Sequence, residues 1–208
     1  MIIFDFDGVL VDTKQSILYT FQKSLERQGY TYSIEEIEQI IGQRPEKVIS
    51  DLIPQDDNIR REKIERANEE YDKILCSEEG LNKVKLLPSA IETVRTLSEK
   101  RFKLAIVTNQ YRQIIKATLK HFSLGGYWDK IIAADDGFKS KVDAALFIIN
   151  LYKITPQKTA YIGDMVKDIE VAKKVGCKMI AIPGWHSRAK LKKANPDYLI
   201  NSLEELIS

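Results

Sequence analysis

The sequence predicts an α/β protein whose core is a parallel sheet and which carries an inserted all-α segment near its N-terminus. The chain opens on an apolar run at residues 1–4. Later in the chain, short apolar runs alternate with segments of helical periodicity, which is typical of a parallel sheet covered on both faces. Between these two regions only helical spacing is found. We therefore expect a Rossmann-like core built from residues 1–13 and 86–208, with a helical cap formed by residues 14–85.

Composition and charge favour an ordinary globular protein. The chain has 208 residues, of which 44% are hydrophobic and 30% charged. Its 32 basic and 30 acidic residues give a net charge of +2, so we expect no nucleic-acid partner. Two cysteines provide no disulfide framework, and no apolar stretch has the length of a membrane span. We therefore expect a cytoplasmic protein without a membrane partner, and its oligomeric state stays open.

Helix signals follow one another through the inserted segment. Ser33 and Glu36 have the spacing of a capping box, and the helix that they begin is expected to end at Gly42. Pro45 suits the first turn of the next helix. A long, highly charged helix is expected over residues 58–75. We expect no strand in this segment.

The alternating part of the chain supplies the remaining strands and helices of the core. Predicted strands lie at residues 104–107, 131–133, 159–162 and 179–182, and predicted helices at residues 88–97, 114–122, 142–151 and 168–175. The strand at residues 1–4 has no crossover partner before residue 104. The helical segment between them is therefore an insertion into the core.

Polar residues follow three of these strands directly. Asp5 and Asp7 come after the first strand, Thr108 after the second and Asp164 after the fourth. In open parallel sheets, ligands bind outside the carboxyl ends of the strands, so these residues are expected to share one site. Clustered carboxylates suit Mg²⁺, and Mg²⁺ with a lysine and hydroxyl donors suits phosphoryl transfer. Asp5 is then a candidate nucleophile and Asp7 a candidate general acid and base.

Four segments resemble the motifs of the haloacid dehalogenase superfamily, in its phosphoglycolate phosphatase-like branch. Asp5–Thr13 reads D-F-D-G-V-L-V-D-T and resembles the first motif, and Val107–Asn109 resembles the second. Lys139 resembles the third motif, and Gly163–Asp168, which reads G-D-M-V-K-D, the fourth. The four segments occur in the order of the family, and a helical cap after the first motif belongs to the same branch.

This resemblance implies a Mg²⁺-dependent phosphatase that hydrolyses a small phosphorylated metabolite through an aspartyl-phosphate. Asp5 would attack phosphorus. Asp7 would protonate the leaving oxygen and then take a proton from the hydrolytic water. Asp5, the backbone carbonyl of Asp7 and Asp164 would hold Mg²⁺, and Asp168 would orient a metal-bound water or the site lysine.

The resemblance also assigns the phosphate-binding residues. Thr108 and Asn109 would bind the phosphoryl group, although the same pair could instead cap the following helix. Lys139 would offset charge between the nucleophile and the phosphate. Here Lys139 is followed by serine where the branch has proline, and Lys141 lies close by. The spacing of 25 residues to Asp164 favours Lys139, and Lys141 remains the alternative.

Residues outside the four motifs are candidates for specificity. Arg44, which follows Gly42 and Gln43, lies where related caps contact the substrate, and a solvated arginine is the equal alternative. Trp185 and His186 either line the mouth of the site or pack elsewhere.

Several other functions stay open. Dehalogenases of this superfamily lack the second acid, so Asp7 favours chemistry on phosphate esters. A pyrophosphatase and a sugar-phosphate mutase of the same superfamily are the alternatives within the class. A non-catalytic binding or regulatory protein is the alternative from another class.

Overall fold

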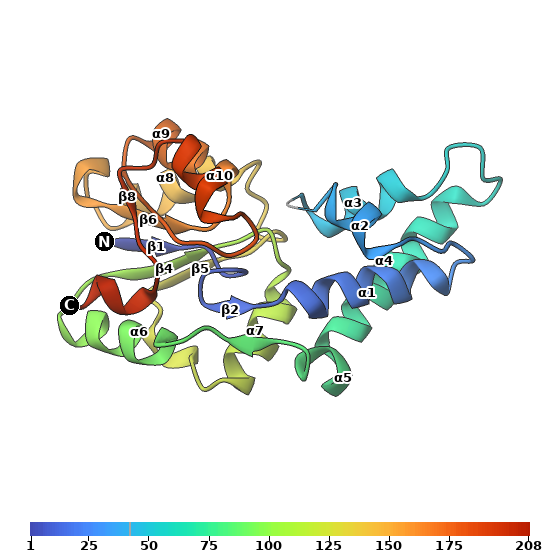
Figure 1. Cartoon of the computed structure of the whole chain (residues 1–208), viewed down its shortest axis with the longest axis horizontal. Coiled ribbons are helices and arrows are strands. Elements are labelled where there is room, and N and C mark those ends of the chain that lie inside the picture. The colour runs from blue at the N-terminus through green and yellow to red at the C-terminus, as the bar shows by residue number, and fades with distance from the viewer. Residues whose placement is uncertain (42) are drawn as a thin grey trace.

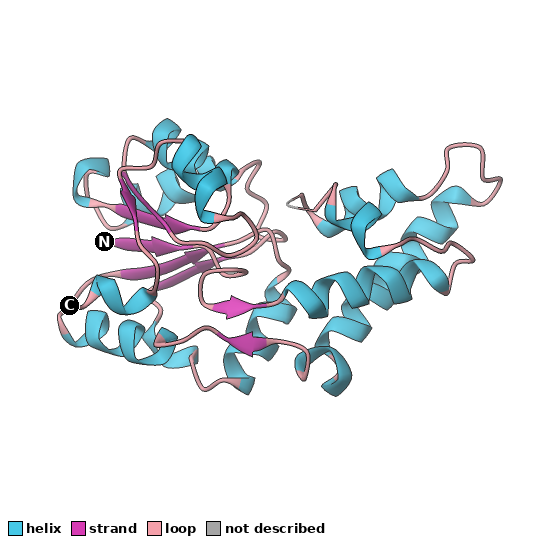
Figure 2. Cartoon of the chain, viewed as in Figure 1, coloured by secondary structure: helices cyan, strands magenta, loops and turns pink. Residues whose placement is uncertain are grey.

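A six-stranded parallel sheet forms the core of the computed structural model, which describes residues 1–41 and 43–208 (Figures 1 and 2). The strand order is β5-β4-β1-β6-β7-β8. The strands are β1 (Ile2–Phe4), β4 (Leu104–Val107), β5 (Lys130–Ile132), β6 (Ala160–Gly163), β7 (Lys178–Ala181) and β8 (Tyr198–Leu199). The predicted α/β class with a parallel sheet is confirmed.

The first strand occupies the middle of the sheet. Ile3 of β1 pairs in register with Ala105 of β4 on one side and with Tyr161 of β6 on the other. All three residues are fully buried. Because neighbouring parallel strands end at the same edge, this register gathers the loops that follow β1, β4 and β6.

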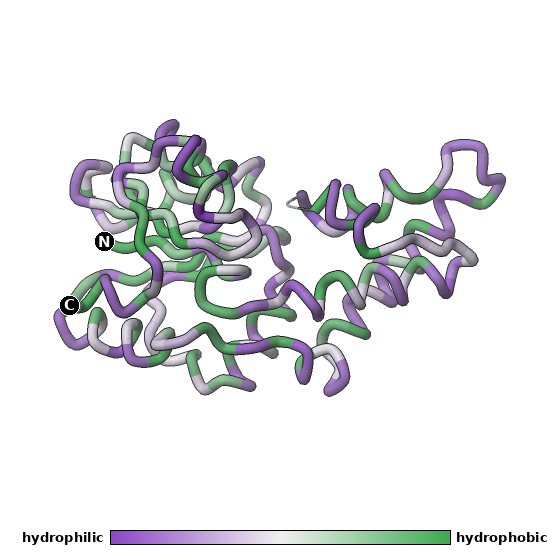
Figure 3. Tube along the Cα trace, in the orientation of Figure 1, coloured by the Kyte–Doolittle hydropathy of each residue, from purple (hydrophilic) through white to green (hydrophobic). Residues whose placement is uncertain are grey.

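Helices cover both faces of the sheet. One face packs against α6 (Ala90–Glu99), α7 (Arg112–His121) and the short helix η3 (Leu203–Leu206). The other face packs against α8 (Lys141–Leu151), α9 (Val166–Val175) and α10 (Arg188–Lys193). Successive residues of a strand point to opposite faces, so every core strand must be apolar on both. Figure 3 shows this as hydrophobic colouring along the sheet.

The inserted segment forms a second group of helices with a hydrophobic cluster of its own. Its helices are α1 (Lys14–Glu26), α2 (Ile34–Glu38), α3 (Pro45–Leu52), α4 (Arg60–Cys76) and α5 (Glu78–Leu81). Phe21 of α1 and Tyr71 of α4 meet in this cluster with ring centroids 4.5 Å apart. The capping box of Ser33 and Glu36 is present, and Pro45 is the first residue of its helix. These two local predictions are confirmed, but the helix that Ser33 begins ends at Glu38, before the predicted end at Gly42.

A two-stranded antiparallel ribbon joins the two parts of the chain and was not predicted. It pairs β2 (Val11–Asp12) with β3 (Lys85–Leu86). The expectation of no strand up to residue 85 is therefore wrong at its last residue. Strands of two residues carry no periodicity that a sequence pattern could reveal. Within the described ranges, none of the helices combines the length and the apolarity needed to cross a membrane.

Candidate active site

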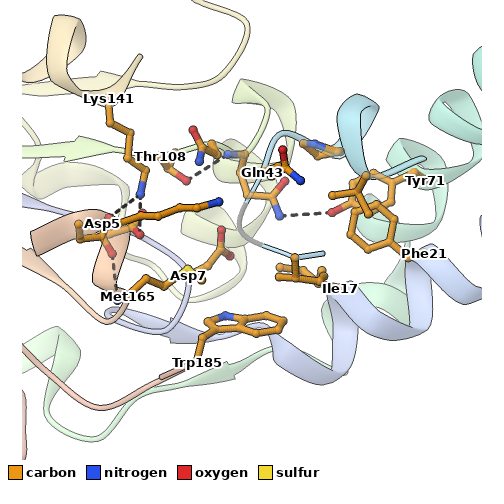
Figure 4. Close-up of a pocket in the computed structure, with 17 residues that line it drawn as sticks. Asp5, Asp7, Ile17, Phe21, Gln43, Tyr71, Thr108, Lys141, Met165 and Trp185 are labelled. Atoms are coloured by element: carbon orange, nitrogen blue, oxygen red, sulfur yellow. Dashed lines mark hydrogen bonds and ion pairs between the residues drawn. The ribbon is translucent and has the colours of Figure 1, made fainter. Parts of the chain in front are cut away.

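One pocket lies between the carboxyl edge of the sheet and the inserted helices (Figure 4). It encloses about 660 Å³ of empty space, its open mouth included. Its polar lining from the core includes Asp5, Asp7, Thr108, Asn109, Lys141 and Asp168. The structure therefore brings together most of the site residues that the sequence predicts.

An ion-pair network centres on Asp5. Lys141 Nζ lies 2.7 Å from Asp5 Oδ2 and 2.9 Å from Asp168 Oδ1. The other oxygen of Asp5, Oδ1, accepts a hydrogen bond of 2.8 Å from the backbone N–H of Phe6. Burial raises the pKa of Asp5, and the charge of Lys141 opposes that rise. The nucleophile candidate is thus fixed in orientation and faces a cation.

Three buried carboxylates offer a metal site. Asp5, Asp164 and Asp168 each place one oxygen so that these atoms lie within 4.8 Å of one another. Asp164 Oδ2 accepts a 2.5 Å hydrogen bond from the backbone N–H of Trp185, whereas Oδ1 has no hydrogen-bond partner among the described residues. Burial raises the pKa of Asp164 well above its ordinary value, with Asp168 and Asp5 adding to the rise. A bound cation would satisfy this isolated oxygen, so the residues fit a metal ion.

Asp168 links Lys141 to the start of α9. Its Oδ1 faces Lys141, and its Oδ2 accepts a 3.1 Å hydrogen bond from the backbone N–H of Met165. Both of its oxygens are therefore engaged by the protein, as are both oxygens of Asp5. Of the three carboxylates, Asp164 is the one with an oxygen that has no hydrogen-bond partner among the described residues.

The loop after β1 passes very close to Asp164. Gly8 in this loop has a φ of +77°, and a Cβ atom there would lie 2.0 Å from Asp164 Oδ2. Only glycine combines this left-handed conformation with so close an approach. The loop at Gly8 and the carboxylate of Asp164 are therefore in direct contact.

Asp7 is held by Thr13, the last residue before the inserted segment. Thr13 Oγ1 donates a hydrogen bond of 2.7 Å to Asp7 Oδ1. Burial raises the pKa of Asp7 to about 6, and the Thr13 hydroxyl and Lys141 oppose the rise. A carboxyl group with a pKa near neutrality suits an acid and base at physiological pH.

Thr108 follows β4 and is buried at the floor of the pocket. Its Oγ1 accepts a hydrogen bond of 3.1 Å from the backbone N–H of Gln110. Helix α7 begins only at Arg112, whose N–H donates to Asp135 Oδ1 at 2.8 Å. The alternative in which Thr108 and its neighbour cap this helix is therefore wrong.

The lysine beside Asp5 is Lys141, which was the alternative. The prediction that Lys139 would lie there is wrong. Lys139 is exposed and is not among the described residues that line the pocket. Ser140 is the N-cap of α8, with its Oγ accepting from the Asp143 N–H at 3.2 Å. Lys141 is consequently the first residue of the helix and reaches Asp5. Without a proline, the sequence could not fix where this helix begins.

The structure does not bring Arg44 into the pocket. Arg44 Nη2 donates a hydrogen bond of 2.6 Å to the backbone carbonyl of Phe138, in the loop after β5. Gln43, its neighbour, lines the pocket instead. Trp185 also lines the pocket, whereas His186 uses Nδ1 to accept from the N–H of Val166 at 3.0 Å.

Gln110 and Tyr71 also line the pocket and were not predicted as site residues. Gln110 comes two residues after Thr108, so its position after β4 was an available signal. Tyr71 lies within a highly charged helical segment, and nothing in that segment indicates a site.

Comparisons with known proteins agree with this geometry. A phosphoglycolate phosphatase from Aquifex aeolicus is 28% identical over 212 residues, which cover 100% of this chain and 94% of that protein. A pyrophosphatase PpaX from Halalkalibacterium halodurans is 28% identical over 222 residues, covering 99% of this chain and 94% of that protein. A solved structure of a haloacid dehalogenase-like family hydrolase from Streptococcus pneumoniae matches with a TM-score of 0.83. It is 22% identical and the match covers 99% of this chain and 95% of that one, so it supports the fold.

A family model described as haloacid dehalogenase-like hydrolase matches residues 2–182, which include Asp5, Thr108, Lys141 and Asp164. Because this match spans well over half of the sequence, the chain belongs to the haloacid dehalogenase-like hydrolase family.

Proposed function

We propose that this hydrolase is a Mg²⁺-dependent phosphatase that cleaves a small phosphate monoester through an aspartyl-phosphate on Asp5. The observation that carries the proposal is the position of Asp5, which pairs with Lys141 and offers an oxygen within 4.8 Å of one from Asp164 and one from Asp168. A candidate nucleophile, a cation and candidate metal ligands thus lie close together. Positioning and charge neutralisation are the main requirements of phosphoryl transfer.

In the first half of the proposed reaction, Asp5 becomes phosphorylated. A carboxylate oxygen of Asp5 attacks phosphorus, and the bond between phosphorus and the leaving oxygen breaks. Asp7 gives its proton to that oxygen, so the alcohol leaves neutral. The hydroxyl of Thr108 donates a hydrogen bond to a phosphoryl oxygen, and Lys141 stays charged beside Asp5.

In the second half, water replaces the enzyme oxygen on phosphorus. Asp7, now ionised, takes a proton from the attacking water, and the bond between phosphorus and Asp5 breaks to release phosphate. Asp5, Asp164 and the backbone carbonyl of Asp7 would hold Mg²⁺, which supplies positive charge against the phosphoryl oxygens.

We also propose the organisation that serves this reaction. Residues 1–13 and 86–208 would form the catalytic core, and residues 14–85 a cap that closes over the substrate and excludes water. The two free cysteines favour a cytoplasmic location. A pyrophosphatase is the second candidate function, favoured by the relatives named PpaX.

The test is phosphate release from 4-nitrophenyl phosphate with and without Mg²⁺. We expect turnover only with the metal, and a loss of at least about 10³-fold in Asp5→Asn. Asp56→Asn, at an exposed carboxylate of the inserted segment, is the matched control and should retain wild-type activity. Equal rates with and without Mg²⁺, or an active Asp5→Asn variant, would overturn the proposal.

A further inference from the structure

The wall of the pocket that the inserted segment forms is apolar except for Gln43. Six residues of the inserted segment form its apolar part: Ile17, Phe21, Ile41, Pro45, Val48 and Tyr71. Met165 and Trp185 extend this apolar lining from the core, and Figure 4 shows Trp185 beside Ile17 at the end of the pocket opposite Lys141. The part of the substrate beyond the phosphate must therefore lie against hydrocarbon.

The charge in the described lining, Lys167 included, comes from the core. The charged residues among the described lining are Asp5, Asp7, Lys141, Lys167 and Asp168, and all of them come from the core. The described lining residues of the inserted segment are all uncharged. Consequently this wall offers no ion pair to an anionic leaving group.

Cations of the inserted segment near the site are engaged elsewhere. Arg44 donates to the carbonyl of Phe138. Lys14 pairs with Glu38 at 2.5 Å and lies 5.7 Å from the ring centre of Trp185. No contact among the described residues directs Arg44 or Lys14 toward the substrate.

One neutral polar pair interrupts the apolar lining. The side-chain amide of Gln110 lies 3.5 Å from the hydroxyl of Tyr71, and these residues are only 5% and 1% exposed. Gln110 Oε1 has no hydrogen-bond partner within the described part of the chain. Buried polar atoms are nearly always satisfied, so this acceptor calls for a donor on the ligand.

We infer that the substrate is a phosphate monoester of an uncharged alcohol with a ring-sized apolar body and one hydroxyl group that donates to Gln110. The inference rests on the proposed phosphatase function and deepens it. It sets this chain apart from relatives named for phosphoglycolate and pyrophosphate, whose substrates carry a second anionic group. The aromatic side chains of Phe21, Tyr71 and Trp185 in the lining suit a ring-sized group.

The test compares substrates with similar leaving oxygens. We expect kcat/KM for 4-(hydroxymethyl)benzyl phosphate to exceed that for 4-carboxybenzyl phosphate and phosphoglycolate by at least about tenfold. Equal or higher values for either of the two anionic substrates would overturn the inference and leave the phosphatase proposal standing. Failure of every substrate to release phosphate with Mg²⁺ would overturn both.

Two variants locate the specificity. Gln43→Arg adds a cation to the inserted wall at an exposed position and should raise kcat/KM for 4-carboxybenzyl phosphate about tenfold. Gln39→Arg, exposed and outside the described lining, is the matched control and should change nothing. Gln110→Leu should remove the preference for 4-(hydroxymethyl)benzyl over 4-methylbenzyl phosphate. If that preference survives in Gln110→Leu, the hydroxyl contact is wrong.

Discussion

Individual side chains at the site are arranged around an excess of negative charge. Lys141 is the cation that bridges two of the carboxylates, Asp5 and Asp168. These carboxylates hold the pKa of Lys141 well above its ordinary value, although burial alone would lower it. Lys141 therefore stays protonated and orients the nucleophile.

Replacement of this lysine tests its role. Lys141→Met should lower kcat by about 10²–10³-fold, because the phosphoryl charge and Asp5 both lose their cation. Lys139→Met is the matched control two residues away, and the exposure of Lys139 predicts wild-type kinetics. The comparison is made by steady-state kinetics, on variants whose circular dichroism spectra match that of the wild type. The opposite result, with activity lost only in Lys139→Met, would contradict the assignment.

The carboxylates could be predicted from sequence, but the lysine could not. Asp5, Asp7 and Asp164 each follow an apolar run, so the end of a strand fixes their place. Lys141 instead depends on the residue at which α8 begins. The Ser140 cap sets that start. In the sequence alone, this position cannot be told from several similar start positions of the helix.

At the scale of elements, the loop after β1 is the piece that joins the nucleophile to the metal site. It leaves the sheet after Asp5, passes Gly8 against Asp164 and enters the ribbon at β2. The backbone N–H of Gly8 donates to the carbonyl of Val11 at 2.8 Å, which closes the loop. A substitution in this loop should therefore change the affinity of the site for Mg²⁺.

Comparing Gly8→Ala with Gly29→Ala separates the close contact with Asp164 from backbone strain. The new Cβ would collide with Asp164 Oδ2, so the apparent affinity for Mg²⁺ should fall at least about tenfold. Gly29→Ala is the control, because Gly29 has a φ of +88° but nothing within 4 Å of an added Cβ. It should cost about 1–2 kcal/mol of stability and leave Mg²⁺ affinity unchanged. The measurement is activity against Mg²⁺ concentration, and equal affinities in both variants would contradict the argument.

Element prediction succeeded where periodicity was long and failed where it was short. Strand β4 was predicted with its observed bounds, Leu104–Val107, because four consecutive buried apolar residues leave little choice. The ribbon of β2 and β3 was missed because each strand has only two residues. Arg44 was predicted to contact the substrate from its position in the sequence alone. That position does not reveal that its side chain turns toward Phe138.

At the scale of the whole molecule, the core and the inserted helices meet through α4 and α7. Asp72 Oδ2 accepts a hydrogen bond of 2.7 Å from Gln113 Nε2 across this contact. Asp72 Oδ1 is buried and has no partner among the described residues. The junction therefore carries a carboxylate that is poorly solvated.

This carboxylate makes global stability depend on pH. Because the folded pKa of Asp72 is raised from 3.8 to about 6, the folded state holds the proton more tightly than the unfolded chain. Its contribution is fully present below pH 4 and is lost as pH rises through 6. Asp72→Asn should raise the free energy of unfolding at pH 8 by about 1 kcal/mol, after allowance for partial exposure, and have less effect at pH 4. Urea denaturation at both pH values measures this, and equal effects at both would contradict it.

The central claim is that phosphate is transferred to Asp5, and the most direct measurement is to trap that intermediate. The enzyme would be quenched in acid during turnover of a ³²P-labelled monoester, digested and mapped. We predict label on the N-terminal peptide that contains Asp5, loss of label with hydroxylamine, and no label in Asp5→Asn. Label on another residue, or wild-type turnover without any labelled protein, would contradict the claim.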